Sequence, residues 1–472
     1  MKPVVFWTDA LVWLVVAVVV GYALYARGRE HLVAPWRRVV RSSAGMAAAV
    51  ILGAYACVGL LDSLHYYPQL ESKDPTAKPV YAVEATSALE WLLADIKRRS
   101  EKTYSAPFAL HLFQRETVEL PGGKVARESV RLRHGGAHLQ SIDQRAADVA
   151  QRIVAALALA AVAWGLVVAC VAAILRKRGA TWRAIWRGET ETAWRAALIA
   201  LALLFALAFP AFALAAKYHI FGTDKVGQDV FYLALKSVRT ALVIGGLTTL
   251  VSLPFAVLLG ISAGYFKGWV DDVITYVYTT LSSIPGVLLI AAFVLMLQVF
   301  FDKHPELFRT TAERADLRLL ALCVILGVTG WIGLARLLRG ETLKLREMEY
   351  IQAAHAFGVS HARVIGRHIF PNVMHLVLIS AVMEFSGLVL AEAVLSYIGV
   401  GVDPTMTSFG TMINTARLEM SREPMVWWAL AAAFVFMFAL VLAANLFADS
   451  VRDAFDPRTN VGRVGLPLGA RA

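Results

Sequence analysis

Long apolar runs are the feature that most constrains how this chain can fold. A helix needs about 20 mostly apolar residues to cross roughly 30 Å of hydrocarbon. Only 17% of the 472 residues are charged, against about a quarter in soluble domains. Barrel strands would alternate over about ten residues, and these runs do not. The sequence predicts an all-α polytopic membrane protein. We place nine spans at about residues 5–25, 43–61, 153–175, 195–216, 240–263, 273–300, 319–338, 372–398 and 425–447.

Basic residues indicate the orientation of these spans. Arginine and lysine collect in the connecting segments 26–42, 176–194 and 339–371 and in the tail after residue 447. Nine spans place all four segments on one side, and the positive-inside rule identifies that side as the cytoplasm. The same bias explains the net charge of +11 without nucleic acid as a partner. An eight-span arrangement with a peripheral first helix stays open.

Residues 62–152 are a long segment that this orientation places outside the cytoplasm. Ser87 and Glu90 form an S-x-x-E capping box at the start of an amphipathic stretch. The stretch RETVELPGGKVARESVRLR alternates around a Pro-Gly-Gly turn, which predicts a β-hairpin. We expect a small extracytoplasmic α+β insert here.

The sequence shows no pattern for catalysis or metal binding. Its three cysteines lie singly in apolar runs, without CxxC spacing. It has no G-x-x-x-x-G-K-[ST] loop that could cradle nucleotide phosphates. We therefore expect a chain that is not an enzyme, holds no metal and binds no cofactor of its own.

The segment EYIQAAHAFGVSHARVIGRHIFPN, residues 349–372, is too polar for lipid yet lies between two apolar runs. Gly358 fits the left-handed end of a first helix, and Ser360 can cap a second. Pro371 fits the first turn of the following span. The alanines of the first helix predict a small outward face that another surface can approach. An amphipathic helix that merely lies in the membrane interface would show a similar pattern.

The spacing of this segment resembles the EAA loop of ABC importer permeases. In that loop E-A-A is followed after three residues by Gly, and after nine more by I-x-L-P. The matching positions are Ala353, Ala354, Gly358 and Pro371. Gln352, His368 and Phe370 replace the usual Glu, Ile and Leu. Because Gln352 carries no charge, an ion pair with an ATPase is in doubt at that position.

Four further segments resemble the dipeptide/oligopeptide/nickel permease family, in family order. FGTDKVGQDVF, residues 221–231, is similar to its G-T-D-x-x-G-R-D segment, with Gln228 in place of Arg. The others are AGYFKGWVDD, LAEAVLSYIGVGVDP and FADSVRDAFDPR. The family positions matched in the first segment are Gly222, Thr223, Asp224, Gly227 and Asp229.

The resemblance covers about residues 195–460 and implies three parts. Residues 191–460 would be a type I permease core of about six helices, with the EAA coupling loop at 349–371. Residues 1–190 would be a three-helix extension that carries the insert 62–152. Residues 461–472 would be a cytoplasmic tail. We expect the extension to be dispensable for ATPase coupling and to serve in docking the binding protein or a second permease.

The resemblance also implies the partners and the mechanism. Such a chain sits in the bacterial inner membrane as a multi-pass subunit and pairs with a homologous sister permease as a heterodimer. Two separate ATPases, which carry ATP and Mg²⁺, would drive import of peptides or related solutes brought by a solute-binding protein. The resemblance assigns ATPase contact to Glu349, Gln352, Ala353, Ala354, Gly358, Ser360, Arg363, Phe370 and Pro371.

Polar or kinked positions inside apolar runs are the candidate pathway residues. These are Ser282, Ser283, Pro285, Glu384 and Glu392, since an ionisable residue in a span is costly and functional by default. For Glu392 a structural role near the outer end of its span, such as an ion pair, is the stronger alternative. Two other functions stay open: a secondary transporter driven by an ion gradient, and a membrane-anchored sensor that uses residues 62–152.

Overall fold

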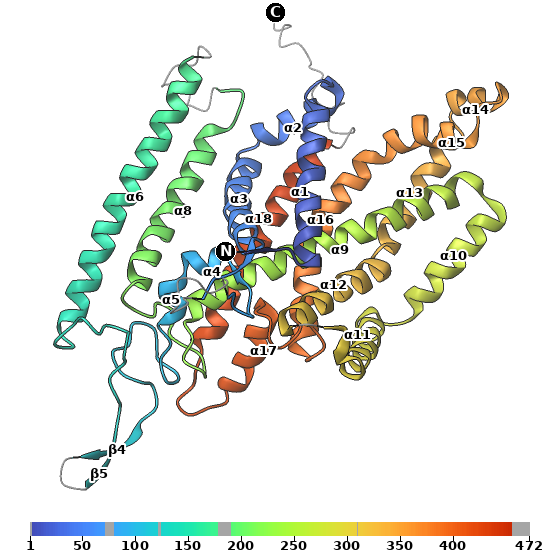
Figure 1. Ribbon diagram of the computed structural model, residues 1–472. Helices are drawn as coiled ribbons and strands as arrows, with labels where there is room; N and C mark the ends of the chain where they lie inside the picture. The colour runs from blue at the N-terminus through green and yellow to red at the C-terminus, as the bar shows by residue number, and fades with distance from the viewer. Residues whose placement is uncertain (1, 71–79, 121–123, 178–189, 309, 456–472) are drawn as a thin grey trace, which may run out of the picture.

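The protein is an open bundle of long helices, and the computed structural model describes residues 2–70, 80–120, 124–177, 190–308 and 310–455 (Figure 1). Within those ranges nine helical segments are long and apolar enough to cross a membrane, which agrees with the predicted nine spans. They are α1 (Trp7–Ala26), α3 (Ser43–Asp62), α6 (Gln144–Arg176), α8 (Trp194–Ala215), α9 (Val230–Phe266), α11 (Gly286–Lys303), the pair α12 (Thr311–Gly330) and α13 (Ile332–Arg346), the segment His361–Tyr397, and α18 (Trp428–Phe455).

Shorter helices connect the spans at both ends of the bundle. They are α2 (Glu30–Arg41), α4 (Ala88–Leu92), α5 (Ala94–Arg98), α10 (Gly268–Ser283), α14 (Glu349–Ala356), α15 (His361–Val364) and α17 (Phe409–Glu419), with a 3-10 turn at Pro305–Leu307. Figure 1 shows α2, α14 and α15 at one end and β4, β5 and α17 at the other. The described basic segments 26–42 and 339–371 thus share the end that holds α14, as the positive-inside argument predicts. Residues 178–189 of the second basic loop and residues 456–472, which include the predicted tail 461–472, lie outside the described residues.

One predicted span is wrong as a continuous helix. The run 273–300 is broken where α10 ends at Ser283 and α11 begins at Gly286. Ile284 is extended, with φ −93° and ψ 131°, because a residue before proline avoids the helical region. Pro285 then lies at the start of α11, where its missing N–H costs no helical hydrogen bond. We expected a bend at this site, and the structure has a full interruption.

The insert 62–152 contains the predicted hairpin, together with strands of a second sheet that the sequence did not reveal. β4 (Glu116–Leu120) and β5 (Lys124–Glu128) pair antiparallel, which confirms the hairpin; its turn, 121–123, lies outside the described residues. A separate antiparallel sheet has the order β1 (Lys2–Val4), β2 (His65–Tyr67), β3 (Thr86–Ser87). The amino-terminal residues therefore join the insert.

The predicted capping box at Ser87 is half correct. Ser87 Oγ accepts a hydrogen bond from the Glu90 N–H at 3.1 Å, as an N-cap should. The Glu90 side chain instead binds Lys97 and Lys236. The amphipathic helix that follows is interrupted at Leu93, between α4 and α5.

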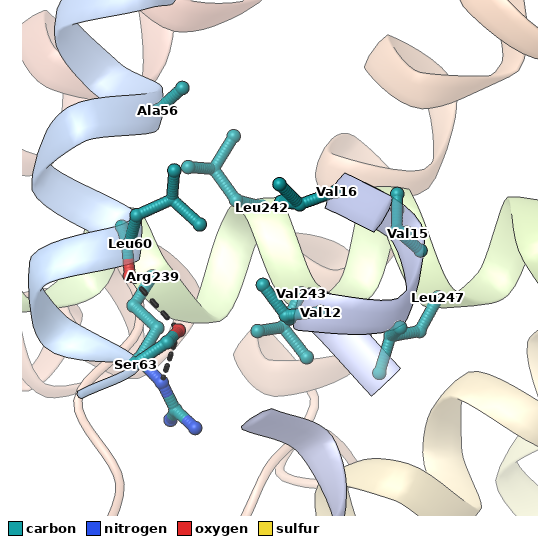
Figure 2. Close-up of a pocket in the computed structure, with 12 residues that line it drawn as sticks. Val12, Val15, Val16, Ala56, Leu60, Ser63, Arg239, Leu242, Val243 and Leu247 are labelled. Atoms are coloured by element: carbon teal, nitrogen blue, oxygen red, sulfur yellow. Dashed lines mark hydrogen bonds between the residues drawn. The ribbon is translucent and has the colours of Figure 1, made fainter. Parts of the chain in front are cut away.

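α9 is the central helix of the bundle. It packs against α1, α3, α10, α12, α13, α16 (Phe370–Tyr397) and α18, and its Ile244 and Leu247 are at most 1% exposed. α1 packs less completely on it. Between α1, α3 and α9 an apolar cavity of about 200 Å³ remains, lined by side chains such as Val12 and Leu242 (Figure 2).

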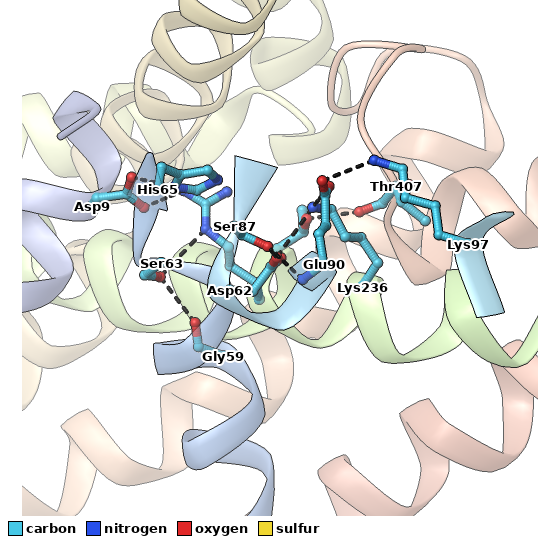
Figure 3. A network of polar contacts seen from close by, with 12 residues as sticks. Asp9, Gly59, Asp62, Ser63, His65, Ser87, Glu90, Lys97, Lys236 and Thr407 are labelled. Atoms are coloured by element: carbon cyan, nitrogen blue, oxygen red, sulfur yellow. Dashed lines mark hydrogen bonds and ion pairs between the residues drawn. The ribbon is translucent and has the colours of Figure 1, made fainter. Parts of the chain in front are cut away.

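Buried ion pairs join residues 1–100 to the core (Figure 3). Arg239 of α9 is 7% exposed and pairs with Asp9 of α1 at 2.5 Å. Lys236, one turn earlier, pairs with Asp62 at 3.1 Å and with Glu90. The extension therefore supplies the counter-ions for two cations of the core. Our expectation that residues 1–190 are dispensable for ATPase coupling stays a prediction, but their removal would take these partners from Arg239 and Lys236.

Candidate functional site

The segment 349–371 forms the helix, glycine turn and second helix that its sequence predicts. α14 ends at Ala356, and Gly358 follows with φ +73°. The Gly358 N–H bonds to the His355 carbonyl at 2.9 Å, and the Val359 N–H to the Ala354 carbonyl at 3.0 Å. These bonds satisfy carbonyls that the helix end would leave unpaired. A Cβ at Gly358 would meet no atom within 4 Å, so backbone conformation alone favours glycine there.

The outward face of α14 is small-sided with one aromatic side chain. Ala353 and Ala356 are exposed, and Phe357 is 87% exposed. Ala354 differs from the prediction: it is half-buried and packs inward against the protein's own core. Sequence reasoning missed Phe357. An aromatic residue next to the glycine cap, one residue beyond a row of alanines, was the signal that could have identified it.

The remaining coupling residues are mostly at the surface. Glu349, Gln352, Ser360, Arg363 and Pro371 are exposed, and Phe370 is half-buried beside the core. Gln352 Nε2 donates to the Glu347 carbonyl at 3.1 Å. Ser360 lies at the N-cap of α15, as predicted, but its side chain makes no capping hydrogen bond.

A buried cluster fixes the loop to the spans. Ile351 of α14, Val364 of α15 and Ile369 are fully buried against α9, α13 and α16, where they contact side chains such as Leu338. A displacement of α14 must therefore move the ends of three spans, because packed cores do not deform continuously.

The sequence suggested that the second helix ends before Pro371. In the structure it does not end there. α15 continues through a π-helical turn (Ile365–Ile369) directly into α16. A proline cannot donate to the carbonyl four residues earlier, and its ring clashes with that carbonyl. The wider π turn relieves this conflict and keeps the helix continuous. The loop is thus connected to the span by continuous helix.

Two histidines hold both sides of the Gly358 turn against the end of α9. The hydroxyl of Tyr265 bonds His355 Nε2 at 3.1 Å and His361 Nδ1 at 2.8 Å. Tyr265 belongs to the family-like stretch AGYFKGWVDD. In the same stretch Asp271 accepts two hydrogen bonds from Arg339, both at 2.6 Å. This stretch, at the end of α9, therefore holds the loop in place, which the sequence alone did not show.

The motif at 222–229 lies at the opposite end of the molecule, where it receives the insert. Gly222 has φ +65° and Gly227 φ +78°. A Cβ at Gly222 would lie 2.2 Å from the Ser105 carbonyl oxygen, and one at Gly227 1.8 Å from that of Glu101. Thr223 Oγ1 donates to the Thr103 carbonyl at 2.9 Å and accepts from the Ser105 N–H at 2.7 Å. These glycines are required because the insert backbone packs directly on the motif.

The acidic residues of the motif organise its backbone. Asp224 Oδ1 accepts from the N–H groups of Val226 at 3.0 Å and Gln228 at 2.8 Å. Asp229 caps α9 through the Phe231 N–H at 2.8 Å. It also binds His219 Nδ1 at 2.7 Å.

His219 joins this motif to the insert through two buried carboxylates. Its other nitrogen faces Glu101 at 3.4 Å, and Glu101 also accepts the N–H groups of Arg133, His134 and Gly135. Burial alone would lower the pKa of His219, but its bonds to Asp229 and Glu101 raise that pKa to about 9. Burial would likewise raise the pKa of Glu101, yet His219 and the three N–H groups lower it to about 2. The imidazolium is therefore charged at neutral pH.

The predicted pathway residues do not lie together. Glu384 lines a cavity of about 240 Å³ with Thr248 and Ser252. Ser282, Ser283 and Pro285 are exposed at the break between α10 and α11, where Ser282 Oγ accepts from Arg336 at 2.9 Å. None of these three lines that cavity.

The surroundings of Glu392 fit the structural role that we considered for it, although no cation pairs with it among the described residues. It is 1% exposed and accepts hydrogen bonds from Ser396 at 2.6 Å and Ser408 at 2.8 Å. Ser408 caps α17. Glu392 thus fastens α17 to α16 through hydroxyl groups, in place of the expected ion pair.

Comparison with known proteins agrees with this arrangement. The family model described as binding-protein-dependent transport system inner membrane component matches residues 256–461. The oligopeptide transport system permease protein OppC of Mycobacterium tuberculosis is 32% identical over 248 residues, which are 52% of this chain and 79% of the relative. OppC of Haemophilus influenzae is 31% identical and covers 51% and 71%. The glutathione transport system permease protein GsiD of Pectobacterium atrosepticum is 31% identical and covers 51% and 73%.

The family match at residues 256–461 falls on the carboxy-terminal half, where the loop 349–371 and its supporting spans lie. The predicted resemblance is thereby confirmed, together with the helical permease fold and the multi-pass location in the inner membrane. The chain belongs to the binding-protein-dependent transport system inner membrane components and is a permease subunit of an ABC importer.

Proposed function

We propose that this permease moves peptides or related small solutes, in a heterodimer with a homologous sister permease. Two ATPase subunits, which bind ATP and Mg²⁺, power the cycle, and a solute-binding protein delivers the cargo. This chain contributes no catalytic group and binds no cofactor. The names of the similar permeases, which transport oligopeptides and glutathione, support this class of cargo.

One observation supports the role of the loop 349–371. Its outer face offers exposed Ala353, Ala356 and Phe357, while its inner face is locked to the spans by Ile351, Val364 and Ile369. To transmit a movement, the loop needs an exposed surface that a partner can contact and a rigid connection to the spans that move. Coupling between ATP hydrolysis and transport needs a two-state element that both sites bias. The continuous helix from His361 to Tyr397 would carry the movement of α14 into the membrane.

The extracytoplasmic end is the side on which the binding protein would dock. The insert is held to the core by the His219 cluster, and Figure 1 shows the β4–β5 hairpin projecting away from the bundle. A projecting hairpin on a fixed base is suited to contact a soluble partner. We propose that the insert orients the binding protein over the pathway.

The test is reconstitution of the whole complex. The permease would be purified with the ATPases, sister permease and binding protein encoded beside it, and the solute that co-purifies with the binding protein identified by mass spectrometry. We expect a peptide or peptide-like solute and ATP-dependent uptake of it into proteoliposomes. Uptake driven by an ion gradient without ATP would support the secondary transporter and contradict this proposal.

A further inference from the structure

A cavity between three spans contains a carboxylate for which the described structure provides no counter-ion. The cavity has a volume of about 240 Å³, larger than an engineered cavity of about 150 Å³ that holds benzene. Its walls come from Thr248 and Ser252 of α9, Leu326 and Gly330 of α12, and Glu384, Gly387 and Leu388 of α16. Two of these seven are glycines at which a Cβ would meet no atom within 4 Å, so the glycines keep the space open.

Glu384 has weaker partners than the other carboxylates inside the spans. Asp9 pairs with Arg239 at 2.5 Å, and Glu392, which also has no cation among the described residues, accepts two hydroxyl hydrogen bonds at 2.6 and 2.8 Å. Glu384 has one hydrogen-bond partner within the described ranges, Ser252 Oγ at 3.5 Å, and no cation. A carboxylate at membrane depth with so little compensation is costly and marks a function. The missing element is a positive charge.

A second group in the cavity is poorly satisfied. Thr248 is 1% exposed, and its hydroxyl makes no hydrogen bond to a nitrogen or oxygen atom of the described residues. It interacts instead with the thiol of Cys323, which is only a weak hydrogen-bonding group. Leaving a buried hydroxyl unsatisfied costs about 1–3 kcal/mol. Thr248 and Glu384 come from different helices and face the same space. One ligand in the cavity could satisfy both.

We propose that Glu384, Thr248 and Ser252 form a binding site for the protonated amine of a transported solute. An ammonium group has three N–H donors and no acceptor, which matches one carboxylate and two hydroxyl oxygens. The aliphatic Leu326 provides a surface for the carbon atoms beside the amine. This inference rests on the proposed function and specifies its cargo: solutes with a free amino group, such as unblocked peptides.

A bare proton is the other cation that Glu384 could take. A site for an amine and a site for a proton differ in one measurable way. An organic ammonium ion can bind to an amine site and shield Glu384, whereas a site that accepts only a proton has no room for it. The neutral alcohol of the same length, n-butanol against n-butylammonium, separates charge recognition from mere filling of an apolar space.

The direct test is carbodiimide labelling of Glu384 in the assembled complex in nanodiscs, read by mass spectrometry. We expect n-butylammonium to slow labelling about tenfold, equivalent to about 1.4 kcal/mol, and n-butanol not to slow it. Thr248→Val, which keeps the side-chain volume, should weaken the protection while Glu384 is still labelled. Equal labelling with both compounds, or labelling that responds to pH alone, would overturn the amine site. This readout does not require transport.

Uptake into proteoliposomes extends the test to cargo. We expect the wild-type complex to import a tripeptide with a free amino terminus faster than its N-acetylated form. Glu384→Gln should abolish this preference, and Glu384→Asp should keep part of it. A variant that slows both peptides equally contradicts amine recognition. Failure of the wild type to import either peptide counts against the proposed cargo class, and the labelling experiment then still decides the amine site.

Discussion

His219→Gln should release the insert from the permease core. The substitution leaves Glu101 and Asp229, each with a side chain 1% exposed, without the cation that lies between them. Breaking a buried charge pair from one side costs about 3–5 kcal/mol. The pKa gives a second estimate: a rise from 6.5 to about 9 corresponds to about 3 kcal/mol. Glu101 keeps its three backbone bonds, so we expect the lower end, about 3 kcal/mol.

The pH dependence of this lock has a defined sign. Because the folded pKa of His219 lies above its usual 6.5, its stabilisation is complete below about pH 6.5 and is lost as pH rises through about 9. The folded pKa of Glu101 is lowered, so its contribution is present above pH 4.5 and is lost as pH falls through about 2. The insert should therefore be held most firmly between about pH 4.5 and 6.5.

Hydrogen exchange of the amides at 133–135 in nanodiscs measures this lock. About 3 kcal/mol corresponds to roughly a hundredfold faster exchange through local opening. His138→Gln is the matched control, because His138 also pairs with an aspartate, at 2.9 Å, but its side chain is 27% exposed. Wild-type protection in the His219 variant at pH 6, or equal loss in the control, would refute the reasoning.

Three other changes test other parts of the structure. Deletion of residues 1–190 should prevent assembly, because Arg239 and Lys236 lose Asp9, Asp62 and Glu90; recovery of an assembled, ATP-coupled complex on size-exclusion chromatography would contradict this. Gly227→Ala should lower the melting temperature sharply, since its Cβ would lie 1.8 Å from the Glu101 carbonyl oxygen, whereas Gly53→Ala, with no atom within 4 Å, should be neutral. Gly358→Pro should abolish ATP-driven uptake with the spans still inserted, because proline loses the bond to His355 and cannot adopt positive φ. Gly358→Asn, which tolerates that conformation, and Gln352→Glu should transport normally; uptake by the proline variant at the wild-type rate would contradict the coupling role.

Local patterns predicted what depends on nearby residues. Apolar runs gave the nine spans, and the spacing around Gly358 gave the turn, because helix formation and capping are set within a few residues. The β4–β5 hairpin followed from alternation for the same reason. Several spans were placed too short: α9 and the pair α12–α13 extend beyond the predicted 240–263 and 319–338.

Contacts between distant segments could not be predicted. Arg239 lies 230 residues from Asp9, and no pattern in either segment identifies the other as its partner. The orientation of Ala354 depended on a cluster assembled from α9, α13 and α16. Phe357 was overlooked because an exposed aromatic residue and a buried one look alike in a sequence. The pathway role of Glu384 stays a prediction; only the structure showed that Glu384 lines a cavity and that Thr248 lies beside it.

The central claim is that α14 and the Gly358 turn contact an ATPase, and site-specific photocrosslinking tests it most directly. A photoreactive phenylalanine analogue at Phe357, which is 87% exposed, keeps the aromatic character of the native residue. Val83, 76% exposed in the insert that we predict to be extracytoplasmic, is the matched control. The account predicts an adduct with the ATPase from position 357, changed in yield by ATP, and none from position 83. An assembled complex that hydrolyses ATP yet gives no ATPase adduct from position 357 would contradict it.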